Sequence, residues 1–174
     1  EASWVKDEAT ARDWILGTLE SSVARLDGAL FWRMMKVLAA DDHDAFLRFD
    51  AWLAAGRESL ELQLEDRRMS EALLTLLSNL EVPSAQHLRG KVLTYPAAFG
   101  IAAHYWEVAP TAALNGLMWT IVEGQVAAAI RLFRLGHTAG QRILIAAIPV
   151  IKRSVEEART IEDDAIVQRP PAPR

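Results

Sequence analysis

Three glutamates that follow an arginine form the first group of residues able to do chemistry. Glu58, Glu61 and Glu65 are spaced three and four residues apart, and Arg57 precedes them. This spacing predicts that the three carboxylates share one face of a helix. Such a face can bind a metal ion, a basic surface of a partner, or arginines of a neighbouring helix, although most surface charge only keeps a protein soluble. We favour structural or partner contacts over a metal site.

Three further polar residues lie within or beside apolar stretches. Gln125 interrupts an apolar run, and Gln141 and Arg142 precede another. A buried amide or guanidinium group must find hydrogen-bond partners, because each unpaired group costs about 1–3 kcal/mol. These side chains therefore either tie together a turn between two helices or present that turn to a partner, and the sequence leaves both alternatives open.

The turn itself is predicted at residues 136–140. Gly136 and Gly140 allow positive φ angles, and the hydroxyl of Thr138 can cap the helix that follows. His137 lies between them. Glu123, at the other end of the same stretch, precedes Gln125.

The four histidines are dispersed along the chain. His43, His87, His104 and His137 include no two at the spacing of metal ligands, so we interpret each as a surface or hydrogen-bonded imidazole. The chain has no cysteine, which excludes disulfides and thiolate metal sites.

Composition excludes several classes of protein. Nineteen Lys and Arg against 23 Asp and Glu give a net charge of −4, which argues against nucleic-acid binding. No glycine-rich phosphate loop and no Gly-x-Ser-x-Gly motif is present, so neither nucleotide binding nor that type of hydrolase is indicated. No apolar stretch is both long enough and free enough of charge to span a membrane.

Helical periodicity extends through almost the whole chain of 174 residues. We predict an N-cap at Asp7, a separation of two helices at Gly28, an amphipathic helix over 57–80, and a helix that begins at Pro110 and is apolar on all sides. The predicted fold is all-α, a single bundle-like domain of about seven or eight helices around that buried central helix. We expect the domain to span residues 1–166 and residues 167–174 to form a proline-rich, flexible tail.

Two motifs resemble the UreF family of urease accessory proteins. The family usually reads Arg-Glu-x-x-Glu in one helix, which matches Arg57, Glu58 and Glu61. It also reads Glu-Gly-Gln-Val, followed by alanines and then Leu-Gly-Gln-Thr-x-Gly-Gln-Arg. The matching residues here are Glu123, Gln125, Gly136, Thr138, Gly140, Gln141 and Arg142. His137 departs from the pattern, because the family usually has glutamine there.

The resemblance implies a non-enzymatic protein of the cytoplasm that takes part in urease maturation. It would dimerise, bind the UreD/UreH accessory protein, and through that complex recruit the GTPase UreG to apo-urease. No cofactor would be bound directly, since nickel is handled by the complex. The motif residues, His137 included, would then serve partner contacts or the motif structure, and none would be catalytic.

Three functions remain as hypotheses. The first is a scaffold for nickel insertion. The second is a regulator of the partner GTPase, in which an arginine such as Arg57 or Arg142 contacts the nucleotide site. The third is a helical metalloenzyme, which the absence of paired Glu-x-x-His motifs disfavours.

Overall fold

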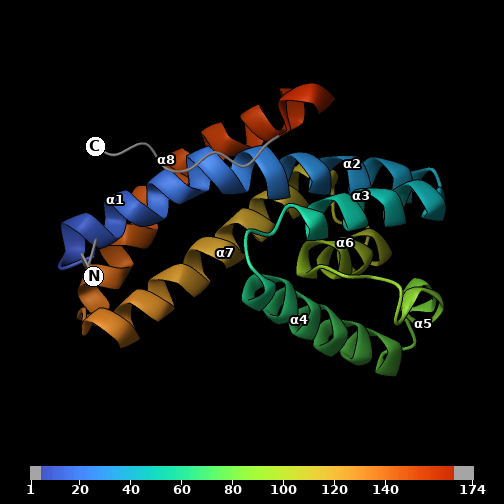
Figure 1. The fold of residues 1–174 in the computed structure, drawn as a ribbon, viewed down its shortest axis with the longest axis horizontal. Coiled ribbons are helices and arrows are strands. Elements are labelled where there is room, and N and C mark those ends of the chain that lie inside the picture. Colours follow the sequence, from blue (N-terminus) through green and yellow to red (C-terminus); the bar gives the residue numbers. More distant parts are fainter. Residues whose placement is uncertain (1–4, 167–174) are drawn as a thin grey trace. The chain divides into compact units, whose positions relative to one another are not determined.

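The computed structural model describes residues 5–166, and every regular element in that range is helical. The elements are α1 (Glu8–Thr18), the π-helix η1 (Leu19–Gly28), α2 (Ala29–Ala39), α3 (His43–Ala55), α4 (Leu60–Asn79), α5 (Pro83–Leu88), α6 (Tyr95–Tyr105), α7 (Pro110–Phe133), α8 (His137–Thr160) and the 3-10 turn η2 (Asp163–Ala165) (Figure 1). The predictions of an all-α fold and of seven or eight helices are confirmed.

The chain divides into two compact units. The first contains Glu1–Gly28 and Asn115–Arg174, and the second contains Ala29–Leu114. The predicted proline-rich tail, residues 167–174, lies outside the described residues. The domain bounds of 1–166 stay a prediction.

In the first unit, α8 packs along η1 and α1. Helix α1 begins as predicted at Asp7, whose carboxylate accepts a hydrogen bond from the backbone N–H of Thr10 at 2.9 Å. Arg25 on η1 pairs with Glu157 on α8. The Arg25 guanidinium also donates to the carbonyl of Ala165 at 3.4 Å, so the C-terminal end of α8 and the segment after it are tied to η1.

The predicted boundary at Gly28 is found, since η1 ends at Gly28 and α2 begins at Ala29, but no turn lies between the two helices. The helical run continues from η1 directly into α2. A Cβ atom at Gly28 would lie 2.6 Å from the Met118 Cε atom and 3.0 Å from the Ala158 Cβ atom. The absence of a side chain therefore serves close packing inside the first unit rather than a turn.

Helix α7 begins at Pro110 as predicted, but its burial on all sides is not confirmed. Leu117 and Val122 are buried, whereas the side chains of Trp119 and Leu132 are exposed. An apolar sequence on every face therefore leaves apolar surface uncovered along this helix.

In the second unit, α2 packs against α3 and α6, and α4 packs against α5 and α6. The interior includes Phe31, Phe46, Leu53 and Ile101, all fully or almost fully buried. These side chains come from α2, α3 and α6, so the apolar faces of those three helices form one core.

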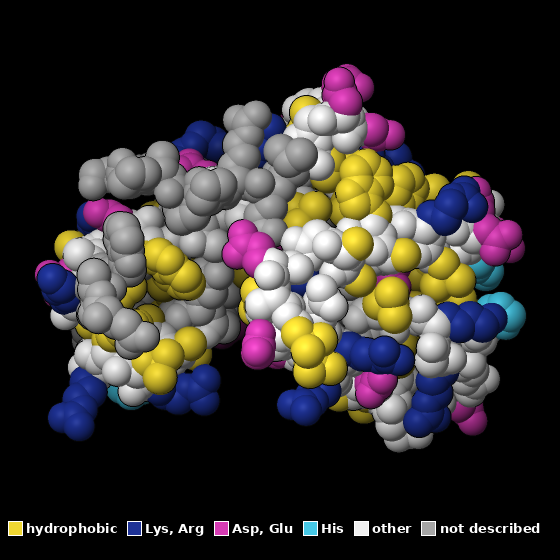
Figure 2. Space-filling model, viewed as in Figure 1, with side chains coloured by type: hydrophobic (Ala, Val, Ile, Leu, Met, Phe, Trp, Pro, Cys, Tyr) yellow, Lys and Arg dark blue, Asp and Glu magenta, His cyan; other side chains and the backbone are white. Residues whose placement is uncertain are grey.

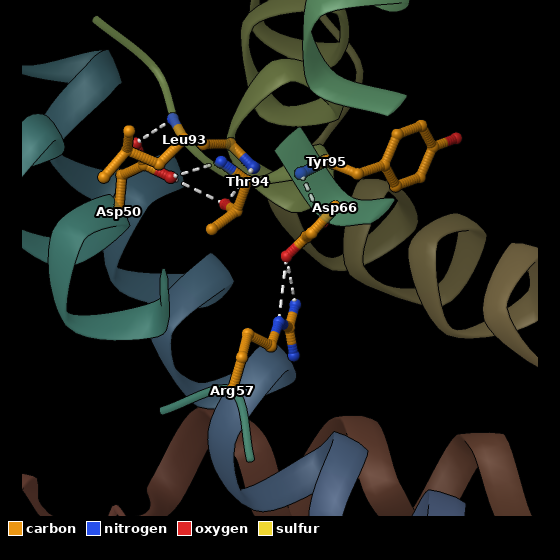
Figure 3. A network of polar contacts seen from close by, with 7 residues as sticks. Asp50, Arg57, Asp66, Leu93, Thr94 and Tyr95 are labelled. Atoms are coloured by element: carbon orange, nitrogen blue, oxygen red, sulfur yellow. Dashed lines mark hydrogen bonds and ion pairs between the residues drawn. The ribbon is translucent and has the colours of Figure 1, made fainter. Parts of the chain in front are cut away.

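A buried carboxylate fixes the start of α6 in this unit. Asp50 on α3 accepts hydrogen bonds from the backbone N–H groups of Leu93 and Thr94 at 2.7 and 3.0 Å, and from the Thr94 hydroxyl at 2.6 Å (Figure 3). Thr94 is the N-cap of α6. Burial raises the pKa of Asp50, and the hydrogen bonds from Thr94 and Leu93 partly oppose that rise.

We predict that Asp50→Asn lowers the free energy of unfolding by about 1–3 kcal/mol, because an amide cannot accept from all three donors and leaves a buried N–H group facing another donor. Asp44→Asn, on the exposed side of the same helix, should cost at most about 1 kcal/mol. Chemical denaturation of both variants measures this, and equal stability of the Asp50 variant and the parent would contradict it.

The difference in stability between the parent and Asp50→Asn should depend on pH. Because the folded-state pKa of Asp50 is raised, the folded protein binds more protons than the unfolded chain between the unfolded-state pKa, about 3.9, and the higher folded-state pKa. The contribution of Asp50 to stability is therefore complete below the unfolded-state pKa and is lost as the pH rises through the folded-state pKa. The stability difference between parent and Asp50→Asn should accordingly be larger near the acid limit of folding than at neutral pH.

Candidate partner-binding site

Arg57 is held inside the second unit rather than presented to a partner. Its Nε and Nη2 atoms both lie 2.8 Å from the Asp66 Oδ2 atom, and the side chains are only 15% and 11% exposed. The Asp66 Oδ1 atom accepts from the backbone N–H of Tyr95 at 2.7 Å (Figure 3). One carboxylate thus joins the segment before α4 to the first turn of α6.

The predicted carboxylate face is only partly formed. Helix α4 begins at Leu60 with Ser59 as its N-cap, so Glu58 precedes the helix and does not share a face with Glu61 and Glu65. A hydrogen bond from its own backbone N–H lowers the pKa of Glu61, with a smaller contribution from Ser59. Glu61 therefore stabilises the start of α4, and all three glutamates are exposed to solvent.

The connection between α7 and α8 differs from the predicted glycine turn. Gly136 has φ −67°, and the left-handed residue is Arg134, with φ 52°. Gly136 is the N-cap of α8, so His137 and Thr138 are its first two residues and Thr138 does not cap it. His137 and Thr138 are both exposed.

Gly140 lies inside α8, where it allows a close approach to α7. A Cβ atom there would lie 2.6 Å from the Ile130 Cδ1 atom and 3.2 Å from the Val126 Cγ1 atom. Both neighbours belong to α7. The glycine is therefore a packing requirement between helices, and the positive φ expected for it is wrong.

The polar motif residues are not brought together. Glu123 is exposed on α7, and Gln141 and Arg142 are exposed on α8. Arg142 reaches Glu8 on α1 across 3.4 Å while remaining 67% exposed. Gln125 alone among the motif glutamines lies in a recess, which we name the α1–α7 groove.

The α1–α7 groove is an apolar recess of about 390 Å³ within the first unit. The lining residues are Val5, Ala11, Trp14, Ile15, Gln125, Ala128, Ala129, Leu132 and Phe133. Ala11 and Ile15 are fully buried at its base, whereas Trp14 and Leu132 remain 45% and 74% exposed. Large side chains of this kind are found where proteins bind one another.

Gln125, which lines the groove, has a buried polar atom without a partner. The amide oxygen of Gln125 is buried and has no hydrogen-bond partner among residues 5–166. A buried acceptor left unpaired costs about 1–3 kcal/mol. The sequence marked Gln125, and Trp14 among six tryptophans of which some could anchor an interface, but it gave no sign of Leu132 or Phe133. Only the fold brings these residues together around one recess.

Hydrophobic side chains are visible in several separate patches of the surface, interrupted by charged side chains of both signs (Figure 2). No helix within the described range is long and apolar enough to cross a membrane. Within that range, no group of three or more His, Asp or Glu residues is placed to hold a metal ion.

Comparison with known proteins decides the family. The family model described as UreF matches residues 5–148, which is most of the chain. The chain belongs to the UreF family. That match includes Arg57, Glu58 and the connection between α7 and α8, so both motifs lie within the matched region.

Curated relatives agree with this assignment. The chain is 54% identical to urease accessory protein UreF 2 of Brucella anthropi over 172 residues, covering 98% of this chain and 76% of that protein. It is 36% identical to urease accessory protein UreF of Marinobacter nauticus over 163 residues, covering 94% and 71%. It is 34% identical to the UreF protein of Psychrobacter cryohalolentis over 170 residues, covering 95% and 72%. A role as a urease accessory protein that supports urease maturation follows from membership of this family.

We predict that Gly140→Val destabilises this UreF-family chain by about 1–3 kcal/mol, because the new methyl groups would overlap Ile130 and Val126. Gly124→Val, at a glycine inside α7, is the matched control. No atom lies within 4 Å of a Cβ placed at Gly124, so that variant should stay within about 0.5 kcal/mol of the parent. Thermal or denaturant unfolding compares them, and two equally stable variants would rule out the close approach as the reason for Gly140.

Proposed function

We propose that the chain is an adaptor in nickel insertion, which links the UreD/UreH accessory protein and the GTPase UreG to apo-urease. The observation that carries the proposal is the α1–α7 groove of a chain from the UreF family. An adaptor needs a surface that gains free energy when a partner covers it. The groove offers exposed apolar side chains, with Trp14 and Leu132 the most accessible.

The free energy expected from burying the apolar side chains of the groove is large enough to support binding of a partner. Complete burial of a leucine or phenylalanine side chain contributes about 1.5–3 kcal/mol, so Leu132 and Phe133 together can account for a substantial part of a micromolar affinity. We assign the groove to the UreD/UreH accessory protein as its occupant.

This proposal predicts the behaviour of two variants at one position. Leu132→Asp should weaken binding of the UreD/UreH accessory protein at least about tenfold, since it removes apolar contact and would bury a charge. Leu132→Met should bind like the parent, because methionine keeps the apolar contact. Leu132 is 74% exposed, so neither change should unfold the chain. Pull-down and calorimetric titration with the purified accessory protein measure the affinities.

Equal binding by the parent and Leu132→Asp would remove the groove from the interface. Loss of binding by Leu132→Met as well would show that the position acts through its shape and not through apolar burial. If the accessory protein fails to bind the parent chain at all, the adaptor proposal itself is contradicted.

Regulation of the partner GTPase is the second candidate, and Arg142 is the observation that favours it. Arg57 is committed to Asp66, whereas the Arg142 guanidinium is accessible beside a long contact with Glu8. If the chain supplies an arginine to the nucleotide site, Arg142→Ala should abolish its effect on GTP hydrolysis by UreG in the assembled complex. A hydrolysis rate that the parent chain leaves unchanged would eliminate this function.

Three further predictions complete the proposal. The chain forms a homodimer, binds no resident cofactor because nickel is cargo of the complex, and does not bind nucleic acid, in keeping with its net charge of −4. None of the motif residues is assigned a catalytic role.

A further inference from the structure

Two histidines that lie far apart in the sequence meet in the second unit. His43 is the first residue of α3, and His87 lies on α5. Their ring centroids are 5.9 Å apart, with an angle of 37° between the ring planes. His87 is exposed and the His43 side chain is one-third exposed, so both rings are accessible to a solute.

This separation suits two ligands of one metal ion. Imidazole nitrogens bind zinc at about 2.0–2.1 Å, which places the ring centroids of two ligands on one ion roughly 5–6 Å apart. The observed separation of 5.9 Å lies within this range. Neutral imidazole is a preferred ligand of zinc, copper and nickel, whereas magnesium and calcium prefer oxygen.

A carboxylate lies beside the pair. The Asp41 Oδ1 atom is 3.5 Å from the His43 Nε2 atom, and the Asp41 side chain is 92% exposed. Asp42, the next residue, has its carboxylate engaged as the N-cap of α3. Asp41 therefore adds negative charge next to the pair, which favours the approach of a cation.

We propose that His43 and His87 form a surface site for a divalent late first-row transition-metal ion such as Ni²⁺ or Zn²⁺. The protein supplies two imidazole ligands, and water fills the remaining positions. A site with open positions binds its ion reversibly, unlike a closed structural site with four protein ligands. This proposal departs from the prediction that the chain binds no metal itself, and it is independent of the α1–α7 groove.

The test uses the full chain without a polyhistidine tag, titrated calorimetrically with Ni²⁺ and with Zn²⁺, and with Mg²⁺ as the oxygen-preferring control. The parent should bind one equivalent of Ni²⁺ or Zn²⁺ saturably and should not bind Mg²⁺. His43→Gln and His87→Gln should each weaken binding at least about tenfold, since even loss of groups that only support metal ligands costs about 10–100-fold. His104→Gln, a matched change at an exposed histidine of α6, should bind like the parent.

A second readout locates the ion directly. Paramagnetic Ni²⁺ should broaden the ring proton NMR signals of His43 and His87 at lower concentration than those of His104 and His137. The proposal is overturned if the parent shows no saturable binding, if the His43 and His87 variants bind as tightly as the parent, or if broadening begins at another histidine. Such a result would leave the groove and the adaptor proposal untouched, because the Leu132 variants test those separately.

Discussion

The packing of the first unit depends on two glycines, which let helices approach one another more closely than any other residue would allow. Gly140 lets α8 contact Val126 and Ile130 on α7, and Gly28 lets η1 approach Met118 and Ala158. One face of α7 is thereby used for packing within the unit. Gln125, Ala129 and Leu132 project from a neighbouring face of the same helix, where they line the α1–α7 groove. The face of α7 that packs within the unit and the face that lines the groove therefore belong to the same helix.

Helical periodicity predicted the class of the fold because it reports only which residues repeat along one face. The sequence also predicted the helix starts at Asp7 and Pro110, since N-caps and first-turn prolines are local signals. The sequence patterns did not predict features that depend on contacts between residues distant in the sequence. Gly28 and Gly140 look like breaks in the sequence, yet both lie within helical runs, and their role depends on side chains distant in sequence. No pattern around either glycine distinguishes a turn from a close helix contact.

The sequence likewise predicted some features of the candidate site and missed others. The sequence singled out Arg57 and Gln125 as polar groups in need of partners, but it did not identify Asp66 as the partner of Arg57. Nor could it show that the Gln125 amide oxygen lacks a partner, because that depends on which groups the fold places around it. His43 and His87 were assigned as isolated residues, since ligand spacing along a chain detects only pairs on one element. The folded second unit brings their rings together.

Family membership supplies the biological setting, and the groove supplies a physical reason for an adaptor. The most direct measurement of the central claim is the nickel content of urease purified after production with the other accessory proteins, in the presence and absence of this chain. The adaptor account predicts nickel-poor, inactive urease without the chain and nickel-loaded urease with it. Equal nickel content in the two preparations would contradict the account.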